Sequence, residues 1–273
     1  MTSKTVVTTF HKKGYDVYAK NMINSFLKNW PEDIQLMVYP EDHEIDERAD
    51  NLIINPLHES SPELVAFKNR WKDDPRARGE VATGPKNKKG KQPGIGFRWD
   101  AIRFSHKVYS VFHAAKNCNT DLLFWMDADM LCHSPITHDF IDAMMPSNVG
   151  LGYLGREKKF SECGLYGMNL KDSRTLEFLA EFQRNYDSGD LFKMQEWNDC
   201  WVFDESRKTI QQQHKKWVQY NWSEGLFSGE GHPLINSSWG AFLDHLKGNR
   251  KELGKSLKKD LIVRRTESYW SNV

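Results

Sequence analysis

The stretch Leu123-Phe124-Trp125-Met126-Asp127-Ala128-Asp129 decides the fold of this chain, because an apolar run typical of a buried strand ends in two carboxylates. Side chains alternate between the two faces of an extended segment, so Asp127 and Asp129 are predicted to project from the strand end on the same side. Two like charges held that close need a cation. Carboxylate oxygens suit Mg²⁺ or Mn²⁺, which often use remaining coordination positions for substrate phosphates. The stretch therefore predicts a metal and phosphate site at a strand end.

The Asp-x-Asp pattern also has a simpler interpretation, because aspartates often cap or hydrogen-bond the backbone where strands end and turns begin. Three-residue patterns also arise easily by chance. The context favours the metal site. The apolar strand Leu122–Met126 follows a helix-like segment, and such α/β arrangements place ligands at the carboxyl ends of strands.

The composition is that of a globular, enzyme-sized unit. The chain has 273 residues, of which 39% are hydrophobic and 12% aromatic, enough for one large packed α/β domain. The formal net charge of +1 excludes a global field that would mark a nucleic-acid or membrane binder, and leaves local charged patches open. Binding partners must therefore be inferred from individual sites.

The cysteines and the apolar runs indicate the compartment. Cys118, Cys132, Cys163 and Cys200 are widely spread without a Cys-x-x-Cys pair, which argues against a structural zinc site or a disulfide scaffold. No apolar run approaches the ~20 residues needed to span a bilayer, and Met1–Phe10 lacks the pattern of a signal peptide. We expect a cytoplasmic protein with reduced thiols and no membrane span.

Strand-like and helix-like segments alternate along the chain. Residues 5–10 are β-branched, 15–30 carry apolar residues at near-helical spacing, and 34–39 read as a second strand. The alternation predicts an α/β fold with a Rossmann-like, mainly parallel sheet flanked by helices. Further predicted elements are a helix over 98–116, strands over 149–154 and 163–170, a helix over 175–186, and irregular aromatic-rich segments over 197–239.

Residues 69–96 are predicted to form a basic loop insertion. The segment loses periodicity and gathers cationic residues among glycines and prolines, namely Arg70, Lys72, Arg76, Arg78, Lys86, Lys88, Lys89 and Lys91. Loops of this length inside a compact domain are usually functional lids or disordered insertions. Contact with an anionic partner and a merely solvated insertion both fit the sequence.

Several of these features together resemble the GT-A class of nucleotide-sugar glycosyltransferases. They are the strand at the N-terminus, the β–α unit after it, the helix carrying Arg98 and Asp100, and the strand ending in Asp127-Ala128-Asp129. The resemblance covers most of the chain. Near the C-terminus, His245-Leu246-Lys247-Gly248-Asn249-Arg250-Lys251 resembles the His-x-x-Gly-x-x-Lys element of the retaining glycogenin and galactosyltransferase-like family, with Glu252-Leu253 in place of the usual Pro-Trp.

The resemblance implies a single GT-A domain over 1–273. Residues 1–130 would form the nucleotide-sugar-binding half, and 131–273 the acceptor-binding half with the C-terminal metal and diphosphate element. Mn²⁺ or Mg²⁺ is the implied cofactor, and a UDP-sugar the donor substrate. The implied site residues are the metal ligands Asp127, Asp129 and His245 and the diphosphate contacts Lys251 and, as a helper, Lys247.

Two histidines compete for the role of third metal ligand. A lone histidine in a lysine-rich tail is more often a surface or helix-capping residue, but Gly248 and Lys251 beside His245 favour the ligand role. His232 is the rival, because the glycines of Gly229-Glu230-Gly231 would let the chain fold over a ligand. Alanine substitution at each histidine would separate the two schemes by metal dependence.

The acceptor side rests on Glu196-Trp197-Asn198-Asp199, which lies between a helical segment and an apolar run. Asp199 is the first candidate for a catalytic carboxylate and Glu196 the second. In an inverting enzyme such a group would take the proton of the acceptor hydroxyl. In a retaining enzyme it would only bind or stabilise the reacting sugar. Each also fits a helix cap or surface acid. Trp197 could stack on a sugar or nucleobase, or serve packing.

Four residues near predicted strand and helix ends are candidates for nucleotide binding. Thr9 and Phe10 end the first strand, where base and ribose would lie. Arg98 can pair with phosphate, and Asp100 can accept hydrogen bonds from ribose or neutralise Arg103 on the next turn. All four are predicted to approach one cleft.

The leading hypothesis is a metal-dependent glycosyltransferase that moves a sugar to a hydroxyl acceptor, which is a glycan, a small molecule or a hydroxylated base in viral DNA. DNA binding through the basic loop would make activity steeply salt-dependent. A sugar-phosphate nucleotidyltransferase is the alternative enzyme, but His11-Lys12-Lys13-Gly14 is poor in glycine for a triphosphate loop. A noncatalytic carbohydrate-binding domain would explain the ten tryptophans, but it would not need paired carboxylates at a buried strand end.

Overall fold

The strand 122–126 lies at the centre of the main sheet of the computed structural model, which describes residues 2–82, 94–226 and 232–272. Within these ranges the main sheet has seven strands in the order β3-β2-β1-β4-β7-β6-β8. Their bounds are β1 (Lys4–His11), β2 (Gln35–Glu41), β3 (Leu52–Ile54), β4 (Leu122–Met126), β6 (Leu151–Arg156), β7 (Lys159–Asn169) and β8 (Gln219–Asn221).

The sheet is mixed but mainly parallel, which confirms the predicted α/β class. β1 runs parallel to both β2 and β4, and β2 runs parallel to β3. β7 is antiparallel to β4 and to β6, and β6 pairs with β8 in parallel. The carboxyl ends of β1, β2 and β4 therefore meet at one edge, where α/β proteins commonly bind ligands.

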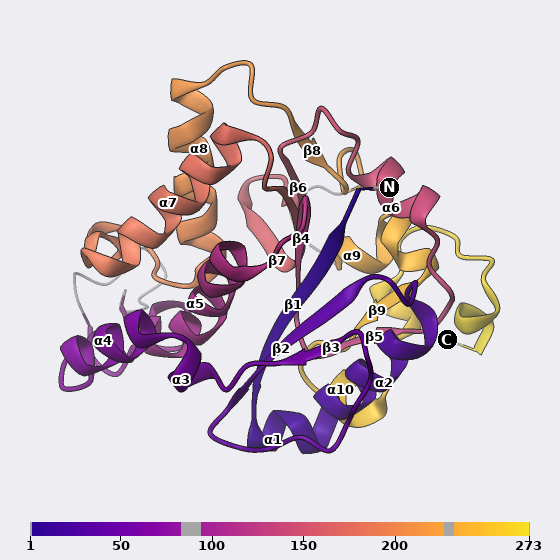
Figure 1. The fold of residues 1–273 in the computed structure, drawn as a ribbon, viewed down its shortest axis with the longest axis horizontal. Helices are drawn as coiled ribbons and strands as arrows, with labels where there is room; N and C mark the ends of the chain where they lie inside the picture. Colours follow the sequence, from indigo (N-terminus) through magenta and orange to yellow (C-terminus); the bar gives the residue numbers. More distant parts are fainter. Residues whose placement is uncertain (1, 83–93, 227–231, 273) are drawn as a thin grey trace.

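Helices cover both faces of the sheet (Figure 1). The longer ones on one face are α4, α5, α7 and α8, and α2, α6 and α9 lie on the other. The helix bounds are α1 (Lys12–Gly14), α2 (Lys20–Asn29), α3 (Leu57–Ser60), α4 (Pro62–Trp71), α5 (Ala101–Asn117), α6 (His138–Met144), α7 (Ser173–Asp187), α8 (Asp199–Gln213), α9 (Pro233–Asn236) and α10 (Arg250–Leu253). A π-helical segment covers Tyr15–Ala19, and short 3₁₀ segments cover Phe97–Trp99, Asp190–Lys193, Ser238–Ala241, Lys258–Asp260 and Ser268–Asn272.

The central strands supply apolar side chains to both faces in alternation. In β1, Val6 packs with the α2 side and Val7 with the α5 side. In β4, Phe124 packs with the α2 side and Trp125 with the α5 side. All four side chains are buried. The continuous apolar run therefore reflects a strand covered on both faces, which is typical of parallel sheets.

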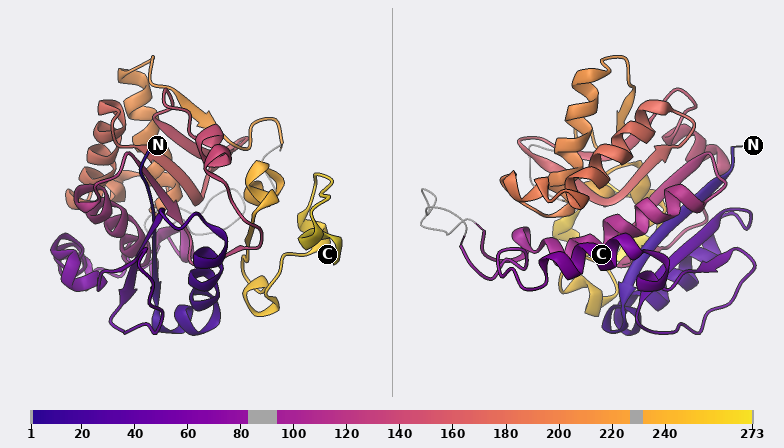
Figure 2. Two further views of the ribbon diagram at one scale, coloured as in Figure 1. Left: turned by 45° about the vertical axis from the view of Figure 1, so that its right-hand side comes forward. Right: turned by 60° about the vertical axis from the view of Figure 1, so that its left-hand side comes forward.

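A small two-stranded sheet fixes the C-terminal part of the chain against the end of β4. β5 (Met130–Cys132) pairs antiparallel with β9 (Leu243–His245), with Met130 opposite His245. The C-terminal segment continues along the outside of the molecule (Figure 2). The pairing brings residues more than a hundred positions apart to the same strand end.

The prediction of irregular structure over 197–239 is wrong for Asp199–Gln213, which forms α8. Asn198 caps this helix by accepting a hydrogen bond from the Trp201 backbone N–H at 3.0 Å. The helix buries a stripe containing Val202 and Phe203. Polar residues on its buried face, such as Asp204 and Ser206, interrupt the apolar periodicity in the sequence.

The predicted basic loop over 69–96 begins later than expected, because α4 extends to Trp71. Two of its arginines are neutralised locally: Arg76 pairs with Asp74 at 2.7 Å and Arg78 with Glu80 at 2.7 Å. Four of its lysines lie outside the described residues, namely Lys86, Lys88, Lys89 and Lys91.

Two findings concern the compartment. All four cysteines are free thiols, in agreement with the expectation of reduced thiols. Across the described residues, none of the helices is both long and apolar enough to cross a bilayer.

Candidate active site

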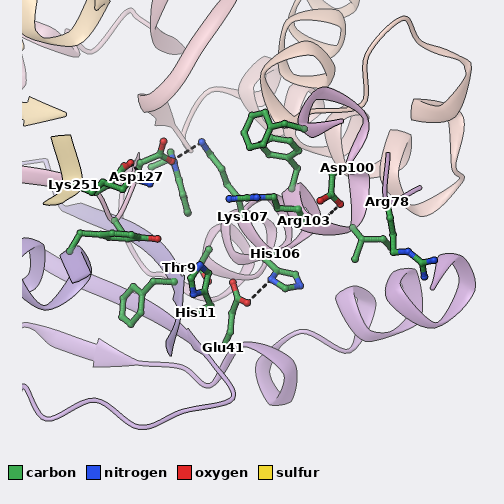
Figure 3. A pocket seen from close by; sticks show the side chains of 18 of the residues that line it. Thr9, His11, Glu41, Arg78, Asp100, Arg103, His106, Lys107, Asp127 and Lys251 are labelled. Atoms are coloured by element: carbon green, nitrogen blue, oxygen red, sulfur yellow. Dashed lines mark hydrogen bonds and ion pairs between the residues drawn. The ribbon is translucent and has the colours of Figure 1, made fainter. Parts of the chain in front are cut away.

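A cavity of about 740 Å³ opens at the carboxyl ends of β1, β2 and β4 (Figure 3). We call it the first cavity. Asp127 and Lys251 lie at one end, and Arg78 and Asp100 lie at the other. Its lining also includes Thr9, Phe10, His11, Tyr18, Glu41, Arg103, His106, Lys107, Trp125 and Asp129.

The two predicted carboxylates lie in the turn that joins β4 to β5, and a histidine meets both. His245 Nε2 is 3.1 Å from Asp129 Oδ1 and 3.7 Å from Asp127 Oδ2. The turn is held from both sides, because the Asp127 N–H donates to the Gly164 carbonyl and the Leu246 N–H donates to the Asp129 carbonyl. The structure therefore brings together the three residues predicted as metal ligands.

Glu162 is a fourth member of this group and was not found from the sequence. Its Oε1 is 3.6 Å from His245 Nδ1. One ligand atom each from Asp127, Glu162 and His245 lie within 4.8 Å of one another. Glu162 reaches the site because β7 runs antiparallel beside β4, a long-range pairing that no local pattern signals. Asp127, Asp129, Glu162 and His245 are called the acidic cluster below.

Gly164 makes room for the cluster. A Cβ at this position would lie 2.5 Å from His245 Cε1 and 2.6 Å from Glu162 Oε1. Real Cβ atoms do not approach other atoms so closely, because interiors are already close-packed. The glycine is therefore required by the approach of these two side chains, and not by its own backbone conformation.

Three lysines neutralise the acids. Lys107 Nζ lies 2.9 Å from Asp127 Oδ1 and 2.8 Å from Asp199 Oδ2, and it also donates to the Cys163 carbonyl. Lys251 Nζ lies 2.9 Å from Asp129 Oδ2, and Lys247 Nζ lies 3.2 Å from Glu162 Oε1.

Lys251 and Lys247 are predicted site residues that the structure places at the cluster. Gly248 has a φ of 59°, so the chain turns tightly there and directs Lys251 back to Asp129. Lys107 was not predicted. It lies in an amphipathic helix among other polar residues, and no local pattern in the sequence singles it out.

Charge pairing shifts the pKa values of the cluster. Burial lowers the pKa of His245, but the carboxylates of Asp129 and Glu162 outweigh burial and raise it to about 9. Burial raises the pKa of Asp129, but His245 and Lys251 outweigh burial and hold it well below its usual range. The pKa of Glu162 is likewise lowered, because Lys247 and His245 outweigh its burial.

The residues of the cluster fit a divalent cation. Carboxylate oxygens with one imidazole nitrogen suit Mn²⁺, and the oxygens alone suit Mg²⁺. Two buried atoms, Glu162 Oε2 and His245 Nδ1, have no hydrogen-bond partner among the described residues. The three lysines and His245 supply the positive charge beside these acids. A bound metal cation would supply positive charge at the same place.

His232, the rival ligand, lies beside His245, with ring centroids 5.5 Å apart and the rings perpendicular. Both of its ring nitrogens are buried and lack a hydrogen-bond partner among the described residues. Burial, then the charge of Lys247, lowers the pKa of His232 to about 3. His245 is the histidine that contacts both aspartates, and the choice of ligand between the two stays a prediction.

The predicted nucleotide contacts separate in the structure. Thr9, Phe10 and Asp100 line the first cavity, whereas Arg98 faces a second cavity described below. Thr9 Oγ1 donates to the Tyr39 carbonyl at 2.6 Å. Asp100 caps α5 by accepting from the Arg103 backbone N–H at 3.0 Å.

Two further residues at this part of the first cavity escaped prediction. Glu41, at the end of β2, lies 2.8 Å from His106 Nδ1. Burial raises the pKa of Glu41, but the hydrogen bond and charge of His106, together with the charges of His11 and Lys68, outweigh burial and lower that pKa overall. The rule that ligands bind at carboxyl ends of parallel strands would have identified Glu41.

The predicted acceptor residues face different sides. Asp199 is buried and pairs with Lys107, which lies in the first cavity. Glu196 faces a second cavity of about 480 Å³ and accepts hydrogen bonds from Arg98 and from Asn198, both at 2.9 Å.

Trp197 belongs to the core and not to a binding surface. Its side chain is 4% exposed, and its ring packs against Phe192 with centroids 5.0 Å apart. The indole N–H donates to the Met194 carbonyl at 3.2 Å. The interpretation of Trp197 as a sugar-stacking residue is therefore wrong.

Comparison with known proteins identifies the fold. No family model matches the chain, and no curated protein matches it. Mouse xyloside xylosyltransferase 1, in its apo form, is similar with a TM-score of 0.50 at 13% identity, over 91% of this chain and 99% of that one. The bifunctional glycosyltransferase WbbM, also apo, gives a TM-score of 0.46 at 9% identity, over 81% of this chain and 39% of that one. The chain has a GT-A-like glycosyltransferase fold, as the sequence predicted.

Proposed function

We propose that the protein is a metal-dependent glycosyltransferase that moves a sugar from a UDP-type nucleotide sugar to a hydroxyl acceptor. One observation carries the proposal. The acidic cluster and Lys251 converge at the end of a 740 Å³ cavity, on the carboxyl edge of a GT-A-like sheet. The sugar is a hexose or a pentose, and the acceptor is a glycan, a small molecule or a hydroxylated base in viral DNA. The predicted location is cytoplasmic.

The chain supplies the positive charge that such a reaction needs. A sugar leaves its nucleotide through an oxocarbenium-like transition state, while negative charge builds on the departing diphosphate. Lys251, held at 2.9 Å from Asp129, is positioned to contact that diphosphate, with Lys247 as a helper. Asp127, Asp129 and His245, assisted by Glu162, would hold Mn²⁺ or Mg²⁺. When bound, that ion supplies Lewis-acid stabilisation of the leaving group.

Asp199 and Lys107 are assigned to the sugar. The Asp199 carboxylate is buried and lies 2.8 Å from Lys107 Nζ. Burial lowers the pKa of Lys107, but Asp127 and Asp199 outweigh it and raise that pKa well above its ordinary value. Asp199 is therefore placed to orient the sugar and to stabilise positive charge on it.

The nucleoside end of the first cavity contains Thr9, Phe10 and Asp100, and also His11 and Glu41. Glu41 and the imidazole of His106 provide polar groups for base or ribose at the carboxyl ends of β1 and β2. Arg98 is removed from the nucleotide contacts of this proposal, because it lines the second cavity.

The test is a thermal-shift screen of nucleotide sugars with and without Mn²⁺, followed by assay of the released nucleoside diphosphate. A ligand that binds only the folded state raises its apparent stability. We expect a UDP-sugar to raise the melting temperature only when metal is present. The proposal fails if no nucleotide sugar stabilises the protein in Mn²⁺ or Mg²⁺, or if stabilisation persists unchanged in Asp129→Asn.

A further inference from the structure

The second cavity is rich in cations and contains an aromatic platform. Five of its lining residues are lysine or arginine and three are aspartate or glutamate. Phe160 and Trp201 complete the lining, with ring centroids 6.1 Å apart. The cavity has a volume of about 480 Å³, enough for a small ring-bearing ligand.

The three acids of this cavity already have partners. Glu196 pairs with Arg98 at 2.9 Å. Asp204 accepts hydrogen bonds from Ser161 and pairs at 3.0 Å with an arginine that does not line the cavity. Glu205 pairs with Lys208 at 3.1 Å. The acids therefore leave Arg156 and Lys158 without a carboxylate partner among the described residues of the cavity.

Arg156 and Lys158 are the two cations of the cavity on which the inference rests. Arg156 donates from Nε to the Phe160 carbonyl at 2.9 Å and from its second terminal nitrogen to the Ser161 carbonyl at 3.5 Å. Neither residue has an ion pair with a carboxylate within the described ranges. Backbone carbonyls use only some of the five guanidinium donors, so the others can bind an anion in a forked geometry.

Two guanidinium groups lie near the ring of Phe160. The Arg156 guanidinium carbon is 4.9 Å from the ring centroid and that of Arg98 is 5.9 Å away. These contacts hold both cations beside the ring. A ligand whose ring packs near Phe160 therefore brings an attached anionic group within reach of Arg156.

Three segments each carry one residue of the second cavity and one residue of the acidic cluster, of the first cavity or of the Asp199–Lys107 pair. β7 carries Phe160 in the cavity and Glu162 in the cluster, two residues apart. Arg98 lies in the second cavity, and Asp100 lies in the first. At the start of α8, Glu196 bonds Asn198, the residue before Asp199. These segments place residues of the second cavity two to three positions along the chain from Glu162 and Asp199.

We propose that the second cavity is the acceptor subsite and that it selects an acceptor bearing an anionic oxyacid group, phosphate or carboxylate, close to a ring. The inference rests on the proposed function. The acceptor oxygen bonds to the anomeric carbon of the sugar as the bond from that carbon to the diphosphate oxygen breaks. The electron pair of the broken bond leaves with the nucleoside diphosphate, which also takes the proton of the acceptor hydroxyl. Arg156 and Lys158 position the acceptor and take no part in these bond changes.

The experiment measures binding of three probes by calorimetry, with Mn²⁺ and UDP present in saturating amounts so that the first cavity is filled. The probes are phenyl phosphate, benzoate and the neutral phenyl β-glucoside. We expect at least one anionic probe to bind tenfold or more tightly than the neutral one. Tighter binding of phenyl phosphate assigns a phosphorylated acceptor, and tighter binding of benzoate a carboxylated one. Equal binding of all three probes overturns the inference.

Matched variants locate the binding. Arg156→Gln and Lys158→Asn should each weaken the anionic probe at least fivefold and leave UDP affinity unchanged. Asparagine is chosen because Lys158 has a φ of 60°, which asparagine tolerates. The control is Arg48→Gln, since Arg48 also donates to backbone carbonyls and lines neither cavity. Unchanged probe affinity in both cavity variants overturns the inference.

The design separates two failures. UDP binding in Mn²⁺ tests the proposed function, and discrimination between anionic and neutral probes tests the acceptor subsite. If UDP binds and the anionic probes show no preference, only the subsite is wrong. If UDP fails to bind, the proposed function is wrong and the acceptor assignment falls with it.

Discussion

The acidic cluster and the second cavity are neighbours with opposite construction. The cluster consists of short side chains fixed by strand pairing, with Asp129 and His245 almost wholly buried. The second cavity consists of long cationic side chains on a hairpin and a helix, and Arg98 is largely exposed. Rigid, preorganised charge suits a step common to every turnover, the departure of the diphosphate. Long flexible side chains suit the acceptor recognition proposed for the second cavity.

The largest effect should come from removing one charge of the cluster. Asp129→Asn takes away the carboxylate that meets both His245 and Lys251, so metal affinity and leaving-group stabilisation should both fall. We expect nucleotide-sugar turnover to drop ~10³-fold, equivalent to about 4 kcal/mol of the barrier. Steady-state release of UDP measures this loss. Asp139→Asn, at an exposed acid in α6, is the control and should keep full activity.

A single methyl group tests whether the rigidity of the cluster matters. Gly164→Ala would press a Cβ against both His245 and Glu162, displacing ligands without removing any. We expect activity and Mn²⁺ affinity to fall about 100-fold, because small misplacements at a reacting centre cost about that much. Gly254→Ala, where φ is 68° and no atom lies within 4 Å of the added Cβ, should cost stability alone. Wild-type Mn²⁺ affinity in Gly164→Ala would show that the cluster adapts.

The contrast also explains what the sequence could reveal. Asp127, Asp129 and His245 were predictable, because a strand that ends in Asp-x-Asp and a His-x-x-Gly-x-x-Lys element are local patterns. The parallel half of the sheet was predictable for the same reason. Its strands are continuous apolar runs between helices.

Residues that depend on long-range pairing were not predictable. Glu162 joins the cluster only through the antiparallel pairing of β7 with β4, and Lys107 resembles an ordinary helix-surface lysine until α5 is packed on the sheet. Arg98 and Asp100 looked equivalent, yet they fall on opposite sides of a tight turn and face different cavities. Sequence spacing gives the order of side chains and leaves open which cavity each one enters.

The two lysines near the cluster should differ in effect. Lys251 lies at the first cavity, over the Tyr18 ring at 4.6 Å, whereas Lys247 is bound to Glu162. We expect Lys251→Met to weaken UDP binding in Mn²⁺ about tenfold, the value of one charge-assisted contact, and Lys247→Met to weaken it less. Calorimetry on both variants decides the order. An equal loss would mean that neither lysine alone contacts the diphosphate.

The smallest effect should appear at the far end of the first cavity, where charge serves stability more than chemistry. Burial raises the pKa of Glu41, but the hydrogen bond and charge of His106, with the charges of His11 and Lys68, together lower it. A carboxylate whose folded-state pKa is depressed stabilises the protein at pH values above its unfolded pKa, and that stability is lost as the pH falls through the folded value. Glu41→Gln should therefore lower the free energy of unfolding by about 1 kcal/mol at pH 7. Urea unfolding of both proteins at pH 7 and pH 3.5 should show the difference shrinking in acid. A difference independent of pH would assign the loss of stability to packing. The charge of Glu41 would then contribute nothing to stability, in contrast to the charges of the acidic cluster.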